Sequence, residues 1–103
     1  MIALLEAHKD ALARLCREYG VRRLEVFGSA ARGEDFAVSS DVDLLVEFAP
    51  DTDFGPWLAH YFEFKEHLQE LLGKEVDLVM AGSLRNPYLL RAIDRDRKLL
   101  YAA

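Results

Sequence analysis

Residues 42–48 have the sequence VDLLVEF, the most apolar run in the chain, and they predict a central β-strand. Side chains on a strand alternate between two faces, so one face of this strand is wholly apolar and is expected to meet helices. That face carries Val42, Leu44, Val46 and Phe48. Asp41 and Asp43 lie on the other face, two residues apart. Their carboxylates should therefore project from the same side of the sheet, roughly 7 Å apart along the strand.

Helices and strands are expected to alternate on both sides of this strand. The predicted helices cover residues 3–19, 57–72 and 87–96, with a short helix within GSAARGE (28–34) opened by the Ser29 hydroxyl, and the other strands cover 21–27 and 75–80. A short apolar tail follows the last helix. The class is α/β or α+β, with a small mixed sheet of about three to four strands and helices packed mainly on one face. About fourteen residues join the first two strands, which leaves their relative direction open.

Length and composition predict one domain over residues 1–103. The formal net charge of −5 disfavours direct binding to nucleic acid, because neutralising phosphates requires clustered Lys and Arg. Cys16 is the only cysteine, which excludes an internal disulfide and a zinc site built on cysteines. No run approaches the roughly 18 apolar residues that cross a bilayer, and the N-terminal segment lacks a signal-peptide core. We therefore expect a cytoplasmic protein with no membrane partner.

A third carboxylate lies in a comparable apolar setting. Asp77 stands between Val76 and Leu78 in the strand over 75–80. If this strand neighbours the central one, at about 4.8 Å, then Asp41, Asp43 and Asp77 can converge. An isolated Asp-x-Asp on a strand usually does no more than face solvent. Three acidic residues in two apolar strands, however, repel one another unless a cation binds. Oxygen-only ligands favour Mg²⁺ or Mn²⁺ over zinc, as in two-metal phosphoryl-transfer sites.

The segment that follows the first strand has the features of a phosphate-binding turn. Gly28 allows the backbone to approach a ligand closely, and Ser29 supplies a hydroxyl group. The amides that follow open a helix, whose N-terminus attracts phosphate. Arg32 is placed to pair with a phosphate oxygen, although a surface position in a helical turn is the simpler alternative. A phosphate cradle beside a metal cluster describes a site for a metal-bound nucleoside triphosphate.

These two stretches together resemble a known signature. Residues 27–34 (FGSAARGE) and 40–46 (SDVDLLV) resemble the motif of the polymerase-beta-like nucleotidyltransferases, and within that superfamily the minimal nucleotidyltransferase (MNT) family. Residues 75–79 (EVDLV) resemble the strand that bears the family's third carboxylate, so the resemblance covers nearly the whole chain. Eleven residues separate Ser29 from Asp41, where ten is commoner in the minimal group, and the extra residue falls in the loop EDFAVSS.

The resemblance implies a polymerase-beta-like fold and a role for each motif residue. Ser29 would bind the terminal phosphates of ATP, and Gly28 would give the backbone access to them. Asp41 and Asp43 would hold metal ions, two Mg²⁺ being the expected set. Asp77 would bind the second ion and help to activate the attacking hydroxyl. The product would be AMP joined to that hydroxyl, with pyrophosphate leaving.

The small size of the chain bears on the acceptor. Once the predicted strands and helices are assigned, no residues are left over to build an acceptor site. The family implies that a HEPN-domain toxin supplies the hydroxyl, a tyrosine, and that the chain is the antitoxin of a type VII-like toxin–antitoxin pair in a hetero-oligomer. One alternative is a binding module that neutralises its partner by occlusion. Another is a small-molecule nucleotidyltransferase of the antibiotic-modifying kind, whose homodimer would form the acceptor cleft.

Several other residues are interpreted as structural. Cys16 is expected to be a small core residue, and Ser40 is expected to shape the loop before Asp41. Glu47 shares the strand face of Asp43 but is expected to be solvated. The run DRDRK at 94–98 is interpreted as a solvated helix end. The helix over 57–72 has more aromatic residues than one buried face needs, so some of them are expected at an interface; they are Trp57, Tyr61, Phe62 and Phe64.

Overall fold

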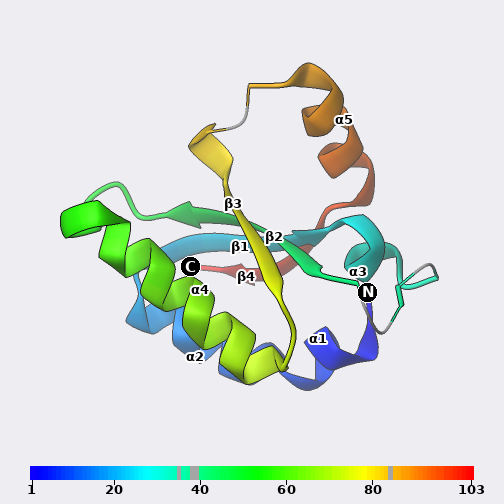
Figure 1. Cartoon of the computed structure of the whole chain (residues 1–103), viewed down its shortest axis with the longest axis horizontal. Coiled ribbons are helices and arrows are strands. Elements are labelled where there is room, and N and C mark those ends of the chain that lie inside the picture. Colours follow the sequence, from blue (N-terminus) through cyan, green and yellow to red (C-terminus); the bar gives the residue numbers. More distant parts are fainter. Residues whose placement is uncertain (35, 38–39, 84) are drawn as a thin grey trace.

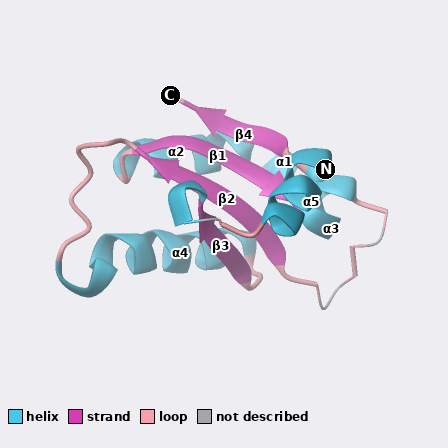
Figure 2. Ribbon diagram, turned by 90° about the horizontal axis from the view of Figure 1, so that it is seen from above, coloured by secondary structure: helices cyan, strands magenta, loops and turns pink. Residues whose placement is uncertain are grey.

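The computed structural model describes residues 1–34, 36–37, 40–83 and 85–103. Its centre is a four-stranded sheet in the order β3-β2-β1-β4, which Figure 2 shows from one face. The strands are β1 (Val21–Phe27), β2 (Val42–Phe48), β3 (Val76–Met80) and β4 (Lys98–Ala102). β1 pairs antiparallel with β2 and β4, whereas β2 and β3 are parallel. The predicted small mixed sheet is confirmed, and the direction of the first two strands is now known.

Helices cover the two faces of this sheet unequally. α1 (Ala3–Ala7), α2 (Lys9–Glu18) and α4 (Ala59–Leu72) pack on one face, as Figure 1 shows. α3 (Gly28–Arg32) follows the end of β1, and α5 (Pro87–Asp96) lies on the opposite side of the sheet next to α3. The second face of β2 and β3 is therefore covered only in part. No helix in the described segments is long and apolar enough to cross a bilayer.

The main core lies between the sheet and the larger helical layer. Its largest fully buried side chains are Phe64, Leu5, Leu12, Leu24, Leu44 and Leu68. The apolar face of β2 contributes to this core through Val42, Leu44 and Val46, as the strand pattern predicts. Cys16 is also fully buried, and burial raises the pKa of its thiol to about 12. The interpretation of Cys16 as a small core residue is confirmed.

The first predicted helix is broken at one residue. In place of one helix over 3–19, α1 ends at Ala7 and α2 begins at Lys9. His8 has φ −107° and ψ 13°, and its Nδ1 lies 2.8 Å from the carbonyl oxygen of Leu4. The imidazole therefore bonds to the end of the first helix while the backbone changes direction. A periodicity of apolar residues does not reveal such a break, because both halves keep the same buried face.

Three other boundaries differ from the prediction. α4 begins at Ala59, not at residue 57, because Trp57 and Leu58 both have φ 57° and form the end of a 3₁₀ turn, η1 (Pro56–Leu58). α3 begins at Gly28 and no side chain caps it, so the expected Ser29 cap is wrong. The apolar tail after the last helix is the edge strand β4, with a register shift opposite Leu24 and Glu25.

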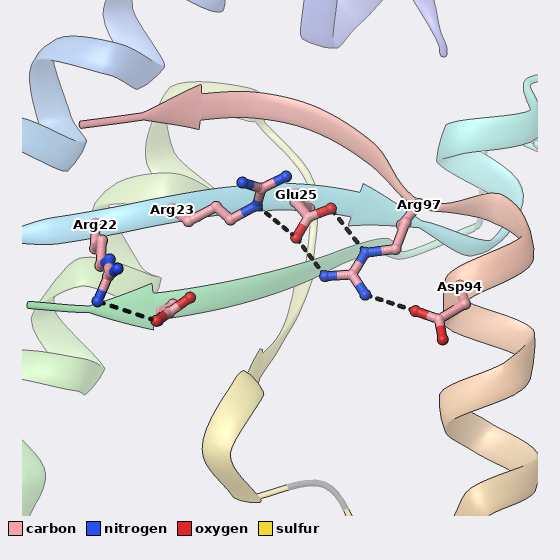
Figure 3. Close-up of polar contacts among 6 residues, drawn as sticks. Arg22, Arg23, Glu25, Asp94 and Arg97 are labelled. Atoms are coloured by element: carbon pink, nitrogen blue, oxygen red, sulfur yellow. Dashed lines mark hydrogen bonds and ion pairs between the residues drawn. The ribbon is translucent and has the colours of Figure 1, made fainter.

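An ion cluster joins the start of β4 to the centre of the sheet (Figure 3). Glu25 of β1 is buried, and Arg97 binds both of its oxygens, with distances of 2.8 Å from Nε to Oε2 and 2.6 Å from Nη2 to Oε1. Arg23 donates a further bond of 3.0 Å to Glu25, and Arg97 also contacts Asp94 at 2.6 Å. Four residues of the run 94–98 are exposed, as a solvated helix end predicts; they are Asp94, Arg95, Arg97 and Lys98. Arg97 nevertheless also locks the end of α5 to β1, which the sequence did not predict.

Replacing Glu25 by glutamine is expected to lower the free energy of unfolding by about 2–3 kcal/mol at neutral pH, because Arg97 loses its charged partner. Hydrogen bonds from Arg97, followed by those from Arg23, lower the pKa of Glu25 from 4.5. This contribution is present above that ordinary value and is lost as pH falls through the lowered pKa of the folded state. Urea unfolding of both proteins at a series of pH values measures the difference.

A matched control is available on the neighbouring strand. Glu47 is exposed and lies 3.8 Å from Arg22, so Glu47→Gln should change the free energy of unfolding by less than about 1 kcal/mol. Equal effects of the two substitutions would contradict the role assigned to Glu25.

Candidate functional site

The register of the sheet brings two of the predicted carboxylates together. Asp43 of β2 stands opposite Asp77 of β3 in the parallel ladder. The Val42 amide donates a 3.0 Å bond to the Glu75 carbonyl, which fixes this register at the start of both strands. Directly opposed residues of neighbouring strands lie about 4.8 Å apart and point to the same face. The two strands are therefore neighbours, so the condition for convergence of the acidic residues is met for Asp43 and Asp77.

The three acidic residues differ in their exposure to solvent. Asp41 immediately precedes β2 and is exposed, as is Asp77, whereas Asp43 is partly buried. The pKa of Asp43 is raised, first by this burial and then by the negative charges of Asp77 and Asp41, while Arg32 opposes the shift. The charges of both other carboxylates therefore act on Asp43.

Tyr61 fixes the strand of Asp77 from behind. Its hydroxyl donates a hydrogen bond to the carbonyl of Leu78, the residue after Asp77. The pKa of Tyr61 is raised by burial and by the charge of Asp77. This bond attaches the edge strand β3 to α4 and so helps to fix the position of Asp77 beside Asp43.

Gly28 forms the wall of the site opposite Asp43. Its φ is +67°, and a Cβ atom at this position would lie 2.5 Å from Oδ2 of Asp43. Two independent constraints, backbone conformation and space, thus require glycine where β1 enters α3. Ser29 follows in the first turn and is partly exposed. Ala30 and Ala31 are fully buried and anchor this turn in the core.

Arg32 makes a contact that the sequence did not predict. Its Nη1 lies 2.6 Å from Oδ2 of Asp96, at the end of α5. Arg32 also lowers the pKa of Asp43, so its positive charge acts on that carboxylate. Arg32 therefore lies at the border of the site, and its contact with phosphate stays a prediction. The sequence offered one signal for Asp96: a carboxylate in the last turn of a helix opposes the helix dipole and needs a cation nearby.

The candidate metal ligands of the site are carboxylate oxygens, and their chemistry and spacing decide which ion could bind. Within the described ranges, no three His, Cys, Asp or Glu side chains converge closely enough to hold a metal ion by themselves. Magnesium in nucleotide sites is commonly held by one or two carboxylates together with phosphate oxygens and water, without a cage made only of protein. The opposed carboxylates of Asp43 and Asp77 are oxygen ligands of this kind, and they fit an ion that would bind together with a nucleotide. The predicted convergence of all three carboxylates, Asp41 included, is not found among the described residues.

Two neighbouring residues behave as the sequence predicts. Ser40 accepts a 3.0 Å bond from the Ala37 amide and so shapes the loop before Asp41. Glu47 shares the strand face of Asp43 but is exposed. The remainder of the expected loop, residues 35, 38 and 39, lies outside the described residues.

Comparisons with known proteins show the family of the chain. Residues 8–100 match the model of the family described as the nucleotidyltransferase domain. The chain is similar to the protein adenylyltransferase MntA of Thermococcus cleftensis, with 44% identity over 84 residues, which is 82% of this chain and 77% of that protein.

Two solved structures share the fold. One is named as a candidate minimal nucleotidyltransferase; it is 37% identical with a TM-score of 0.74, over 91% of this chain and 90% of that one. The other is the crystal structure of an MntA toxin–antitoxin complex; it is 25% identical with a TM-score of 0.68, over 92% of this chain and 72% of that one.

Proposed function

Because this chain belongs to the nucleotidyltransferase domain family, in its minimal branch, we propose that it transfers AMP from ATP to a tyrosine hydroxyl of a HEPN-domain toxin and so acts as the antitoxin. One observation carries the proposal. Gly28, at the start of the small-residue turn, packs against Asp43, and Asp43 stands directly opposite Asp77. A turn suited to phosphate and a cluster of carboxylates thus form a single site.

Each candidate site residue has a part in this proposal. Ser29 binds the terminal phosphates of ATP, and Gly28 leaves room for them beside the backbone. Arg32 pairs with a phosphate oxygen. Asp41, Asp43 and Asp77 would hold Mg²⁺, or Mn²⁺, which when bound supplies neutralisation of phosphate charge.

The reaction is a displacement at the α-phosphorus of ATP. A new bond forms between the acceptor oxygen and this phosphorus, while the bond from the phosphorus to the oxygen bridging to the β-phosphate breaks. Pyrophosphate leaves with that electron pair, and the proton of the acceptor hydroxyl passes to Asp77. Most of the rate enhancement comes from positioning and from fixed charges, as in other phosphoryl transfers.

The choice of acceptor rests on two supports. A relative that is 44% identical is named as a protein adenylyltransferase, MntA, and a protein of that name lies in a toxin–antitoxin complex with the same fold. The resemblance of residues 27–34 and 40–46 to the minimal family implies a HEPN-domain toxin as the partner.

Intact mass spectrometry of a HEPN-domain protein produced together with this chain tests the proposal. After incubation with this chain, ATP and Mg²⁺, the toxin is expected to gain the mass of one or more AMP units, and the gain should be absent with a chelator. Peptide mapping should then locate AMP on a tyrosine. An unchanged mass together with a stable complex would contradict AMP transfer and support neutralisation by binding alone.

That second function has a specific observation in its favour. Trp57 is 93% exposed and Phe62 is 56% exposed, both near the start of α4, while Phe64 lies in the core. Trp57 and Phe62 thus lie outside the core, and their place at an interface stays a prediction. Exposed aromatic side chains of this kind are typical of binding surfaces, so occlusion of a partner would also use this end of the molecule.

A further inference from the structure

We propose that Asp96 is a positioning residue for nucleotide binding: its carboxylate holds the Arg32 guanidinium at the border of the Asp43–Asp77 site, oriented toward the phosphates of the nucleotide. The inference rests on the proposed function and adds to it a residue from the far end of the sequence. Asp96 contacts the phosphate-binding turn at Arg32, and it would act on the nucleotide through this side chain.

The contact between Arg32 and Asp96 is short, and the two side chains differ in their exposure to solvent. Arg32 Nη1 and Asp96 Oδ2 are 2.6 Å apart, and the two residues are separated by 64 positions in the sequence. The side chain of Asp96 is 14% exposed, whereas that of Arg32 is 43% exposed. The carboxylate is thus a largely enclosed acceptor, and the guanidinium that it holds faces solvent in part, where a ligand can reach it. Arg32 is the last residue of α3, whose first residue, Gly28, packs against Asp43.

The position of Asp96 is itself fixed by the next residue. Arg97 binds both oxygens of the buried Glu25, as Figure 3 shows, and so locks the end of α5 to β1. A side chain on a locked helix end can hold Arg32 in one orientation before any ligand arrives. Such preorganisation reduces the conformational entropy that binding would otherwise remove from a long side chain.

A local role within α5 does not account for Asp96. It is the last residue of that helix, where the negative end of the helix dipole disfavours a carboxylate. The amides that a carboxylate could cap lie at the other end of the helix, where Asn86 bonds to the amides of Tyr88 and Leu89. The pairing with Arg32 compensates for an otherwise unfavourable position.

The test is the dissociation constant of ATP with Mg²⁺, measured by calorimetry on the full chain. Asp96→Asn is expected to weaken binding roughly three- to tenfold, the effect of releasing one long side chain from a fixed orientation. Asp94→Asn is the matched control: it removes a carboxylate from the same helix end that also contacts an arginine at 2.6 Å, but its partner is Arg97. That variant should bind ATP within twofold of the wild type.

A double-mutant cycle separates positioning from a structural effect. Arg32→Gln alone should weaken ATP binding at least as much as Asp96→Asn, and Asp96→Asn should have no further effect in the Arg32→Gln background. Circular dichroism checks that all variants are folded. If Asp96→Asn does not fold, Arg32→Gln still tests the contact, because it removes the other partner.

The possible outcomes distinguish this inference from the proposed function. Unchanged or tighter ATP binding by Asp96→Asn, with weaker binding by Arg32→Gln, would overturn the positioning role alone; tighter binding would mean that Asp96 competes with phosphate. An equal loss from Asp96→Asn with and without Arg32 would also overturn it. If the wild-type chain binds no ATP, both the inference and the proposed function are wrong.

Discussion

The Asp41→Asn, Asp43→Asn double variant is expected to lose AMP transfer by at least roughly a thousandfold while keeping its fold. The substitutions remove two of the three carboxylates proposed to hold Mg²⁺ and leave the size of each side chain nearly unchanged. The rate is measured as AMP incorporated into the HEPN-domain toxin per unit time. Glu47→Gln is the control, since it removes a carboxylate from the same strand face at an exposed position.

The same double variant is expected to be at least as stable as the wild type at neutral pH without metal. Burial and the charges of Asp77 and Asp41 raise the pKa of Asp43 above its ordinary value of 3.8, so its ionised form is disfavoured in the folded protein. This penalty is fully present above the raised pKa and disappears as pH falls below the ordinary value, because the carboxyl is then protonated in both states. Urea unfolding in the presence of a chelator should show that the variant exceeds the wild type in free energy of unfolding by less at acid pH than at neutral pH.

If the double variant still transfers AMP, the assignment of Asp41 and Asp43 to the site is contradicted.

Gly28→Ala is expected to reduce AMP transfer by roughly a hundredfold and to lower the free energy of unfolding by about 1–3 kcal/mol. A left-handed conformation is unfavourable for alanine, and its Cβ would lie 2.5 Å from Oδ2 of Asp43. The Asp43 side chain must then move away from residue 28 and so leave its present position in the site. Transfer assays and urea unfolding measure the two effects separately.

Gly33→Ala provides the matched control for Gly28. Gly33 ends α3 with φ +84°, but nothing lies within 4 Å of the Cβ that alanine would add. Its substitution therefore introduces comparable backbone strain without the clash, and AMP transfer should stay within severalfold of the wild type. If both glycine variants lose transfer equally, the effect comes from the conformation of α3 and not from the contact with Asp43.

Much of the site could be predicted because its signals are local. The apolar run at 42–48 requires a buried strand, and an acidic residue within such a run must face away from the core. The same pattern at 75–80 placed Asp77, and the parallel register of β2 and β3 then brought Asp43 and Asp77 together. The sequence predicts that Gly28 allows the backbone to approach a ligand; the structure places Asp43 next to this glycine, and the approach to a ligand stays a prediction.

The features that the sequence did not reveal depend on distant partners. Residues 98–102 form a strand only because β1 offers a free edge, and a register shift obscures the alternation of their side chains. The contacts from Arg32 to Asp96 and from Glu25 to Arg97 span 64 and 72 positions, and nothing near either residue specifies the other. Trp57 and Leu58 adopt positive φ values that neither side chain favours, so local propensity could not place the start of α4.

The pairing of Glu25 with Arg97 also has a consequence for synthesis on the ribosome. The acidic residue is made 72 positions before its guanidinium, an interval of roughly 4–14 s at ordinary rates of translation. During that interval Arg23 can pair with Glu25, but the two bonds from Arg97 are missing and the cluster is incomplete. Because a buried carboxylate is stable only when it is well paired, we expect a nascent chain interrupted before residue 97 to leave Glu25 hydrated.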